Sequence, residues 1–487
     1  MPARQVRRRP GARRPLVRSG QAGAVLPAMV ILTVAILILI LTTFHVGALD
    51  ASLVAQGVSR SQALYIAEGG LSKGQSWLEA YGDPPAVSDT LFPFGEDVGT
   101  FADGRELVWI VPDGAGGPGG YFTIVSEATV RGRTRRLETD VRAGIFSDFL
   151  YFTDTEHMPG SGNPLWFCTG DVIEGPMFTN DQISIFGDPR FTSMASSAYG
   201  GPQDSNINHN AAIYYYNNSA TNHIESTQST NAPYDEPDFA EGVQLGAEHI
   251  IYPRLPSVFE FRADARDGGI DLAGAYEVVL GRDPGTGVPM LGYVSYRKST
   301  TGWTDVLLSS INGIMFVNGT VSVQGVLDGR LTIVTNGNIT VTNDITYLAS
   351  NEDGPLEGCD DMLGLLSGAD IVVENNAPNC DDCVIHAAMM SLCNSFYANS
   401  WNTGSPRGNL TVWGSIVQSF RGNVGTGALI NGQPVVITGY AKDYHYDWRL
   451  QVECPPGFYR FLKTGNYKRL AWREIPQDEL GYTPTAI

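Results

Sequence analysis

The sequence has few of the charged residues that helical proteins carry on their surfaces. Asp, Glu, Lys and Arg make up 17% of the 487 residues, and lysine is scarce. A helical bundle normally places many glutamates and lysines on its exposed faces. The 56 glycines, together with many Asn, Thr and Val residues, instead favour turns and strands. We therefore predict a mainly β protein, of a length that allows two or three domains.

Several local motifs of catalysis are also missing. The seven histidines form no HxH, HxxxH or HExxH pair, and there is no GxSxG, no P-loop and no GxGxxG between a strand and a helix. We therefore predict that the protein is not an enzyme and has no catalytic residue. His386 lies in an apolar stretch and is expected to be a hydrogen-bonded core residue. His445 and Asp447 would share one face of a strand, most simply as a structural lock.

Cysteine is limited to six residues, of which four lie within 35 positions. In an exported chain these four are candidates for disulfides: Cys359, Cys380, Cys383 and Cys393. The CxxC spacing of Cys380 and Cys383 leaves zinc binding and thiol redox chemistry as alternatives. A four-cysteine zinc site usually has two such pairs, and the two aspartates between these cysteines disfavour a reactive thiolate.

Two pairs of aspartates flank the same cysteines, and they are Asp360-Asp361 and Asp381-Asp382. Carboxylate oxygens suit calcium, and clustered carboxylates on a β-solenoid could also serve glycoside chemistry. Acidic loops in contact with water explain the same residues more simply. Apart from calcium at these aspartates, we expect no cofactor and no metal.

Acidic residues are absent before Asp50, whereas seven arginines lie between Arg4 and Arg18. The chain after residue 23 holds 25 basic and 51 acidic side chains, a net charge of −26. Such a surface disfavours nucleic acid, because phosphate binding needs concentrated Lys and Arg. It suits an exported domain that stays soluble by self-repulsion.

An uncharged apolar run follows the arginines, from Ala24 to Phe44. Its 21 residues match the ~30 Å hydrocarbon layer as a helix, with Leu26, Ile31, Leu37 and Leu41 among the anchoring side chains. The basic residues 1–23 place the N-terminus in the cytoplasm, so the helix crosses the membrane once. A cleaved secretory signal would have a shorter apolar core, about 7–15 residues. A twin-arginine signal and a plain signal anchor would also begin with a basic segment and an apolar run.

Residues 45–80 continue the helical pattern. Apolar residues recur at spacings of 3, 4, 7 or 11 along one side of a helix, and they are Leu49, Leu53, Leu64, Ala67, Leu71 and Leu78. Gly47, Gly57 and the pair Gly69-Gly70 weaken the pattern. We predict an amphipathic helix that continues directly from the membrane helix.

This N-terminal part resembles type IV pilin-like proteins. The resemblance covers about residues 18–80 and rests on a basic leader that ends at Gly23, on the following Ala-Val-Leu-Pro-Ala-Met, and on the Ala-Glu-Gly-Gly-Leu of the long helix. It is closest to minor pilins of the PilX class and pseudopilins of the GspK class. Major pilins carry a glutamate at the fifth mature position, where this chain has Ala28. The resemblance therefore implies a minor component rather than the main filament subunit.

The resemblance further implies how the protein is processed and where it resides. A prepilin peptidase would cut between Gly23 and Ala24 and methylate the new N-terminus. The protein would lie in the bacterial inner membrane, with most of the chain periplasmic or extracellular on a type IV pilus or a type II secretion pseudopilus. Its partners would be the inner membrane, other pilin-like subunits, the peptidase and extracellular surface ligands, with no nucleic acid. A membrane-anchored carbohydrate-active or carbohydrate-binding protein and a stand-alone adhesin are the alternatives.

The extracytoplasmic part divides into three predicted segments. Residues 81–145 form a small antiparallel module, with a hairpin that turns at Arg131-Gly132-Arg133. Residues 146–450 form a large β domain with a long polar surface insertion at 193–235, where a tolerated insertion and a binding loop are both open interpretations. Residues 451–487 form a C-terminal tail.

The stretch 311–347 carries the clearest fold signal, because strands of about three to five residues alternate with Asn-Gly or Asp-Gly corners. An antiparallel meander could look like this, but so could a right-handed β-solenoid. We predict the solenoid, with a β-sandwich as the alternative, because so many strands are short and followed by glycine. This body resembles a poorly characterised group of bacterial exported β-solenoid proteins, from which no activity follows.

Overall fold

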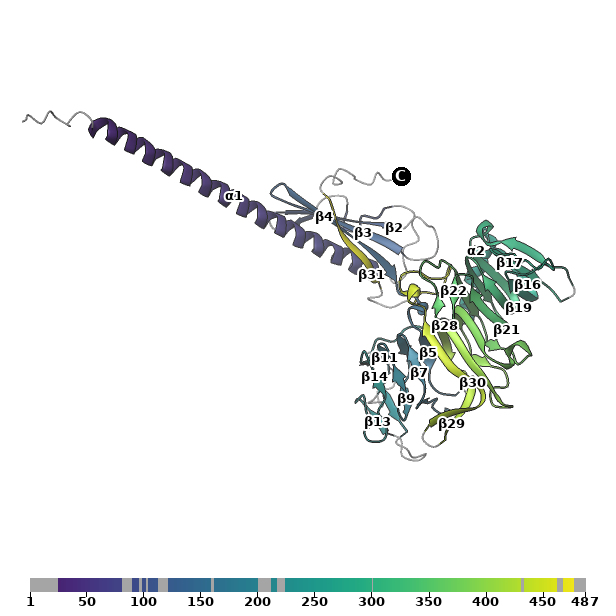
Figure 1. Ribbon diagram of the computed structural model, residues 1–487. Coiled ribbons are helices and arrows are strands. Elements are labelled where there is room, and N and C mark those ends of the chain that lie inside the picture. Colours follow the sequence, from purple (N-terminus) through teal and green to yellow (C-terminus); the bar gives the residue numbers. More distant parts are fainter. Residues whose placement is uncertain are drawn as a thin grey trace, which may run out of the picture.

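The computed structural model shows a long helix, a small antiparallel sheet and a large parallel β domain (Figure 1). It describes residues 25–80, 90–95, 99–101, 104–112, 121–158, 162–199, 212–216, 224–299, 301–430, 433–461 and 467–476. The mainly β fold class is confirmed. The single long helix, α1 (Val25–Ala80), is continuous through both predicted helical segments.

The small sheet contains the predicted hairpin and packs against the end of α1 (Figure 1). Its strands pair antiparallel in the order β1 (Gly99–Phe101), β2 (Gly104–Pro112), β3 (Tyr121–Val130), β4 (Arg133–Ala143) and β31 (Tyr467–Ile475). Arg131 and Gly132 both have positive φ, at 49° and 76°. Two such residues form the two-residue turn that matches the twist of a hairpin.

The fifth strand corrects the expectation of a simple C-terminal tail at 451–487. Strand β31 pairs with β4, Tyr467 opposite Ala143, although more than 320 residues of chain lie between them. The large β domain is therefore an insertion between two neighbouring strands of the small sheet. Local sequence patterns carry no information on a pairing of this range, so they indicate only a tail at this position.

The large domain is a β-solenoid, and its parallel stacking excludes the alternative sandwich. We number its faces in the order in which the chain passes along them. The first face is a ten-strand parallel stack in the order β16 (Ile270–Leu280), β19 (Ile314–Leu327), β20 (Arg330–Thr335), β24 (Met362–Ser367), β26 (Cys383–Ser391), β28 (Pro406–Phe420), β5 (Tyr151–Thr155), β8 (Met177–Thr179), β11 (Ala195–Ser197) and β15 (Val243–Leu245).

The third face is stacked in the same way. Its strands follow the order β21 (Ile339–Tyr347), β26, β28, β30 (Gln433–Tyr446), β7 (Val172–Glu174), β10 (Arg190–Phe191) and β14 (Asp238–Phe239). Only the later part of β21 and the first parts of β26 and β28 lie on this face. The second face is in two separate pieces: β16, β19, β21, β25 (Ile371–Val373) and β27 (Phe396–Ala398); and β6 (Phe167–Cys168), β9 (Ile183–Phe186), β12 (Ile213–Tyr215) and the antiparallel β13 (Ile224–Ser226).

The chain enters this solenoid in the middle of the stack. Strand β5 lies between β28 and β8, so residues 151–245 stack in one direction and residues 270–446 come back to them from the opposite end. We call these the N-terminal half and the C-terminal half, and the β28–β5 and β30–β7 contacts the seam. Residues 246–269 connect the two far ends, with Tyr252 bonded to the Ser391 carbonyl on the way.

Shorter helices and strands lie in the segments that connect the strands of the solenoid. They are η2 (Phe146–Asp148), η3 (Leu255–Glu260), α2 (Phe261–Arg266), β17 (Tyr293–Arg297), β18 (Thr304–Leu307), η4 (Leu308–Ser310), β22 (Ser350–Asn351), β23 (Gly354–Pro355), η5 (Pro378–Cys380), β29 (Gly425–Ile430) and η6 (Trp448–Gln451). The predicted insertion at 193–235 is only partly one, because β11 and β12 belong to the walls of the solenoid. Residues 200–211 and 217–223 of that insertion lie outside the described residues.

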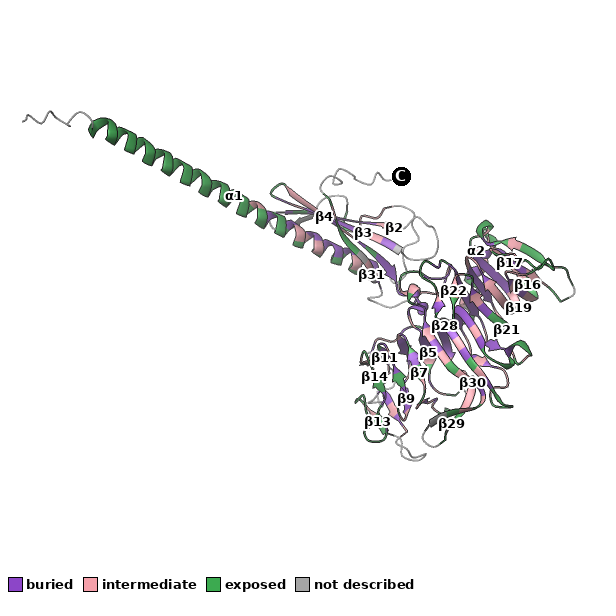
Figure 2. Cartoon of the chain, in the orientation of Figure 1, coloured by how far each residue is buried: buried purple, intermediate pink, exposed green. Residues whose placement is uncertain are grey.

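Each β domain has its own apolar core, and burial changes sharply along α1 (Figure 2). The solenoid core is filled by inward-facing Ile, Val, Leu, Met and Phe side chains. The smaller core lies between the end of α1 and the sheet, with Leu71, Leu78, Ile110, Ile124 and Val141. The N-terminal half of α1 contacts neither core.

Candidate functional site

The exposed half of α1 is a continuous apolar surface. Helix α1 is about 84 Å long at 1.5 Å per residue, and every residue from Val25 to Ala55 is exposed. The four predicted anchor residues Leu26, Ile31, Leu37 and Leu41 are between 53% and 72% exposed. In the described residues this is the one helix long and apolar enough to cross a membrane. A surface of this extent normally marks a membrane or protein contact.

The polar side chains within the apolar run are hydrogen-bonded to the helix itself. The Thr33 hydroxyl donates to the Met29 carbonyl, and Thr42 and Thr43 donate to Ile38 and Leu39. Hydroxyls bonded to the preceding turn present no unsatisfied donor to a hydrocarbon environment, where such a group would cost several kcal/mol. This segment is therefore suited chemically to lipid or to the apolar side of other helices.

The C-terminal half of α1 is docked on the small sheet by two glycines. A Cβ atom on Gly70 would lie 2.1 Å from Ser126 Oγ, and one on Gly74 would lie 2.6 Å from Ile124 Cγ2. These residues allow the helix backbone to approach β2 and β3 more closely than any side chain would permit. Gly69, by contrast, faces open space. The Gly69-Gly70 pair that weakens the helical pattern is thus explained at Gly70 by packing.

Polar contacts fix the position of the docked helix. Lys73 pairs with Glu106 of β2. Gln75 Nε2 donates to the carbonyl of Tyr467 at 2.9 Å, and its Oε1 accepts from Arg469 Nε at 2.8 Å. The helix is therefore bonded both to β2, which precedes the solenoid in the sequence, and to β31, which follows it.

A buried ion pair joins the sheet to the solenoid. Arg142, at the end of β4, pairs with Asp148 in η2, and neither side chain is exposed to solvent. Arg142 also donates to the carbonyl of Gln451 at 2.8 Å, where the chain leaves the solenoid. One guanidinium thus contacts both connections between the two β domains, which makes the junction rigid.

Two ion pairs and one histidine–carboxylate hydrogen bond cross the seam within the solenoid. Both ion pairs have the cation on the C-terminal half and the anion on the N-terminal half, and they are Arg421–Glu156 at 2.5 Å and Lys442–Asp171 at 2.7 Å. The ring of His445 is hydrogen-bonded to Glu174 at 2.7 Å. Arg421 and Glu156 are both buried. This consistent polarity holds the two halves in one register.

The predicted disulfides are not formed, because all six cysteines are free thiols in the structure. Cys383 faces the solenoid interior, while Cys380 is exposed on η5, so the CxxC residues have different environments. Burial raises the pKa of Cys383 to about 12. Cys359 lies 3.6 Å from Asp361 rather than near another sulfur atom. The spacing in sequence does not reveal that one cysteine of the CxxC pair is buried and the other exposed.

The four aspartates predicted as candidates for calcium binding or glycoside chemistry do not form one site. Asp361 is buried and accepts hydrogen bonds from the Gly329 and Ala349 amides. Asp360, Asp381 and Asp382 are exposed, and Asp382 accepts from the Asn409 amide. No group of three His, Cys, Asp or Glu residues is placed to hold a metal in the described part of the chain. These carboxylates mainly cap turns of the solenoid.

The histidines behave partly as predicted. His386 is buried and its Nδ1 accepts from the Tyr347 amide at 3.2 Å, which confirms a satisfied core residue. His445 does not contact Asp447, which instead pairs with Arg449. The ring of His445 bonds Glu174 and Asp443 and stacks on Trp413 at 4.3 Å. It is still a structural lock, but across the seam rather than along its own strand.

The predicted processing site, Gly23 and Ala24, lies outside the described residues. Three residues with a clear structural role were not predicted: Gly70, Gly74 and Arg142. The spacing of Gly70 and Gly74 by four residues on one helical face was the available signal for the first two. Nothing local distinguished Arg142 from the other arginines of its hairpin.

Similarity to known proteins is found among solved structures. No known family model matches the sequence, and no curated protein matches it. Among solved structures, the competence-associated pilin ComZ from Thermus thermophilus is 13% identical, with 86% of this chain and 97% of that chain covered and a TM-score of 0.29. A TM-score this low does not establish a common fold, so the function below rests on the helix and the sheet themselves.

Proposed function

We propose that the protein is a pilin-like minor component of a type IV pilus or a type II secretion pseudopilus, with a structural rather than a catalytic role. The single observation that carries this is the division of α1. Its first half is an exposed apolar rod, and its second half is docked on an antiparallel sheet through Gly70 and Gly74. Outside the membrane, the exposed apolar half of such a helix would be covered by other apolar surfaces, such as the helices of neighbouring subunits.

The size of the solenoid supports a position at an end of the assembly. The whole solenoid is inserted between β4 and β31, at the end of the sheet away from the exposed helix (Figure 1). A domain of this bulk on every subunit would crowd a filament, whereas one copy at an end has free space. Ala28 in place of the usual glutamate agrees with this minor role.

In this proposal the chain is anchored in the bacterial inner membrane by residues 24–44, with its N-terminus in the cytoplasm. A prepilin peptidase cuts after Gly23, and Ala24 becomes the methylated N-terminus. Residues 45–58 then contact other pilin-like subunits, and the solenoid faces the periplasm or the outside.

Site-specific photo-cross-linking in the producing bacterium tests the assembly role. A photoreactive amino acid at Val54, which is 67% exposed on α1, is expected to cross-link to another pilin-like protein. The same amino acid at Val288, which is 65% exposed on the solenoid, is the matched control and should give no such product. Equal products from both positions, or no protein partner at Val54, would contradict the proposal.

A further inference from the structure

The second face of the solenoid is interrupted at the seam. The first and third faces are continuous there through β28–β5 and β30–β7. On the second face, β27 is the last strand of its stack, and β6 begins a separate sheet. In the described chain no strand fills the space between β27 and β6. At this one place the wall continues as residues 421–424, which run beside β27 without forming a strand.

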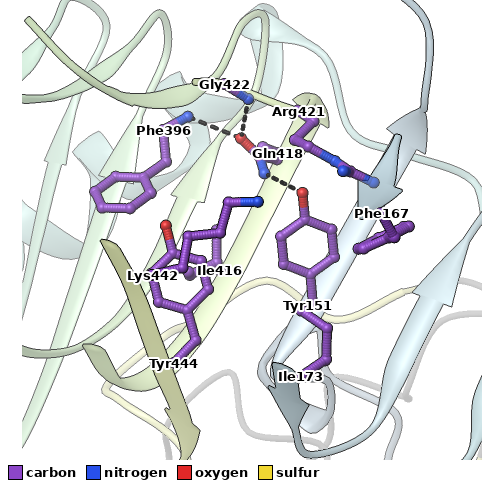
Figure 3. A pocket seen from close by; sticks show the side chains of 10 residues that line it. All are labelled: Tyr151, Phe167, Ile173, Phe396, Ile416, Gln418, Arg421, Gly422, Lys442 and Tyr444. Carbon is purple, nitrogen blue, oxygen red and sulfur yellow. Dashed lines mark hydrogen bonds between the residues drawn. The ribbon is translucent and has the colours of Figure 1, made fainter. Parts of the chain in front are cut away.

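Side chains cap the free edge of β27 (Figure 3). Gln418 Oε1 accepts from the amides of Phe396 at 3.0 Å and Gly422 at 3.1 Å, and its Nε2 donates to the Tyr151 hydroxyl at 3.1 Å. The Ala398 amide donates to the Asn423 carbonyl at 3.1 Å. Since these amides are already paired, a peptide cannot add as a further strand at this edge.

The segment beside β27 contains a buried charge, on Arg421, that is fixed and neutralised. Arg421 bonds Glu156 at 2.5 Å and the Trp166 carbonyl at 2.8 Å, and its guanidinium lies 3.6 Å from the ring centre of Phe167. Because the cation is buried with a carboxylate on it, it is not free to bind an anion. Arg421 is thus a fixed floor beside β27 that provides no anion site.

Above this floor is a surface groove of about 370 Å³. This volume falls in the ~300–1,000 Å³ range of small-molecule sites. Aromatic and polar side chains line it together, and they include Asp370, Asn394, Tyr397, Trp401, Phe420 and Asn423. Aromatic faces beside a few fixed polar groups are the usual composition of a binding site for a small organic molecule.

The polar groups of the groove fall into two kinds. Asp370 is held in place, because its carboxylate accepts from Asn394 Nδ2 at 3.0 Å and from the Ser395 amide at 3.2 Å. The indole nitrogen of Trp401, the hydroxyl of Tyr397 and the side-chain amide of Asn423 have no hydrogen-bond partner within the described part of the chain. The groove thus offers unused donors and acceptors beside two aromatic rings.

The backbone before Trp401 is held in a strained conformation. Ser400 has a φ of 56°, and apart from the hairpin residue Arg131 it is the one non-glycine residue with positive φ among the described positions. Arg407 maintains this conformation by donating to the carbonyls of Asn399 and Ser400 at 2.7 and 3.1 Å. Such conformations are uncommon for non-glycine residues and cost about 1–3 kcal/mol.

The charge around the groove narrows the class of ligand. Burial raises the pKa of Tyr397, and the carboxylates of Asp370 and Glu374 raise it further. The aromatic wall therefore lies in a negative potential, which disfavours phosphates and other anions. A neutral ligand with several hydroxyls fits better, because its apolar ring face can pack on an aromatic ring while its hydroxyls use the free polar groups.

We propose that this groove binds a pyranose ring of a neutral saccharide, packed against Trp401 and Tyr397, with Asn423 and Asp370 bonding its hydroxyls. The site is for binding, since the carboxylates that the sequence suggests for glycoside chemistry lie elsewhere in the structure. It does not depend on the assembly role of α1. It gives the solenoid a ligand class, a neutral glycan on a surface.

The test uses the full-length protein in a zwitterionic detergent without a sugar headgroup, because an alkyl glycoside would compete. The probes are neutral oligosaccharides of glucose, galactose, mannose and N-acetylglucosamine, screened on an array and measured by calorimetry. We expect saturable binding to at least one series. Trp401→Ala should weaken it tenfold or more, and Tyr397→Phe, which removes only a hydroxyl, several-fold.

Trp472→Ala is the matched control, because Trp472 is 52% exposed on β31 of the small sheet. It should leave saccharide binding unchanged. The thermal unfolding midpoint of Tyr397→Phe should stay close to that of the parent, which separates lost binding from lost folding. The proposal is overturned by an absence of binding to every neutral series, by unchanged affinity in both groove variants, or by an equal loss in Trp472→Ala.

Discussion

Arg142 and Asp148 form an ion pair that is wholly buried between the small sheet and the solenoid. The Asp148 carboxylate also accepts from the Ile145 amide at 3.0 Å, so it orders the turn through which the chain enters the solenoid. Arg142 reaches across to the exit segment at Gln451. This one ion pair therefore contacts both segments that connect the small sheet to the solenoid.

Replacing Arg142 should lower the free energy of unfolding. Arg142→Met leaves Asp148 buried without its partner, and breaking a buried pair in this way costs about 3–5 kcal/mol. The measurement is denaturant-induced unfolding of the full chain in detergent. Arg190→Met is the control, since the Arg190–Asp238 pair is about 60% exposed on both sides and such pairs contribute about 0–1 kcal/mol. Similar losses in the two variants would show that Arg142 does not hold the junction.

Two adjacent glycines of α1 should respond oppositely to the same substitution. Gly70→Ala places a methyl group against Ser126 and Val108, and overpacking of this kind costs roughly 1–3 kcal/mol. Gly69→Ala meets open space in the same helix and should add about 0.5–1 kcal/mol of stability. Thermal unfolding of both variants measures the difference. If Gly70→Ala is neutral or stabilising, the close approach of helix and sheet is wrong.

The stability of the solenoid should fall in acid through His386. Burial lowers the pKa of His386 to about 4, against about 6.5 in an unfolded chain. Between these values the unfolded state binds a proton that the folded state does not, so the stabilisation present above pH 6.5 is lost as the pH falls. The loss is about 3 kcal/mol between pH 7 and pH 4.

A neutral variant isolates this contribution. His386→Gln keeps an acceptor for the Tyr347 amide but does not titrate. The unfolding free energy of the variant should therefore drop less between pH 7 and pH 4 than that of the parent, by about 3 kcal/mol. Parallel pH curves for the two proteins would mean that His386 is not held neutral by burial.

Membrane anchoring should depend on position along α1. Leu37→Arg with Leu41→Arg places two cations in the predicted span, at a cost of about 5–7 kcal/mol on an insertion scale. The pair Leu49→Arg and Leu53→Arg has the same spacing, lies beyond Phe44 and is the control. We expect the first variant, and not the second, to be lost from the alkali-resistant membrane fraction. Retention of both variants would contradict a span at residues 24–44.

What the sequence predicted well depends on neighbours along the chain. The continuous helix through residue 80 and the hairpin turn around Gly132 follow from local periodicity and turn residues. The stretch from Ile314 is β as predicted, but it forms one strand of 14 residues, β19, where strands of about three to five residues were expected. The burial and bonding of His386 followed from the apolar residues around it. These features need no knowledge of distant contacts.

What the sequence did not predict depends on contacts between distant segments. The pairing of β31 with β4, the position of β5 between β28 and β8, and the contact of Arg142 with Gln451 each join residues more than 250 positions apart. The groove at Trp401 exists because two stacks of strands meet without a shared strand, and no local pattern encodes that meeting. The four cysteines predicted as disulfide candidates are free in the structure, and spacing alone does not say which of them lie close enough to pair.

The most direct test of the assembly proposal is the mature N-terminus. The protein is produced in a bacterium that has a prepilin peptidase, and its N-terminal peptide is identified by mass spectrometry, with Gly23→Val as the uncleaved control. The account predicts a chain that begins at a methylated Ala24. An intact arginine-rich leader, or cleavage well beyond Phe44, would contradict it.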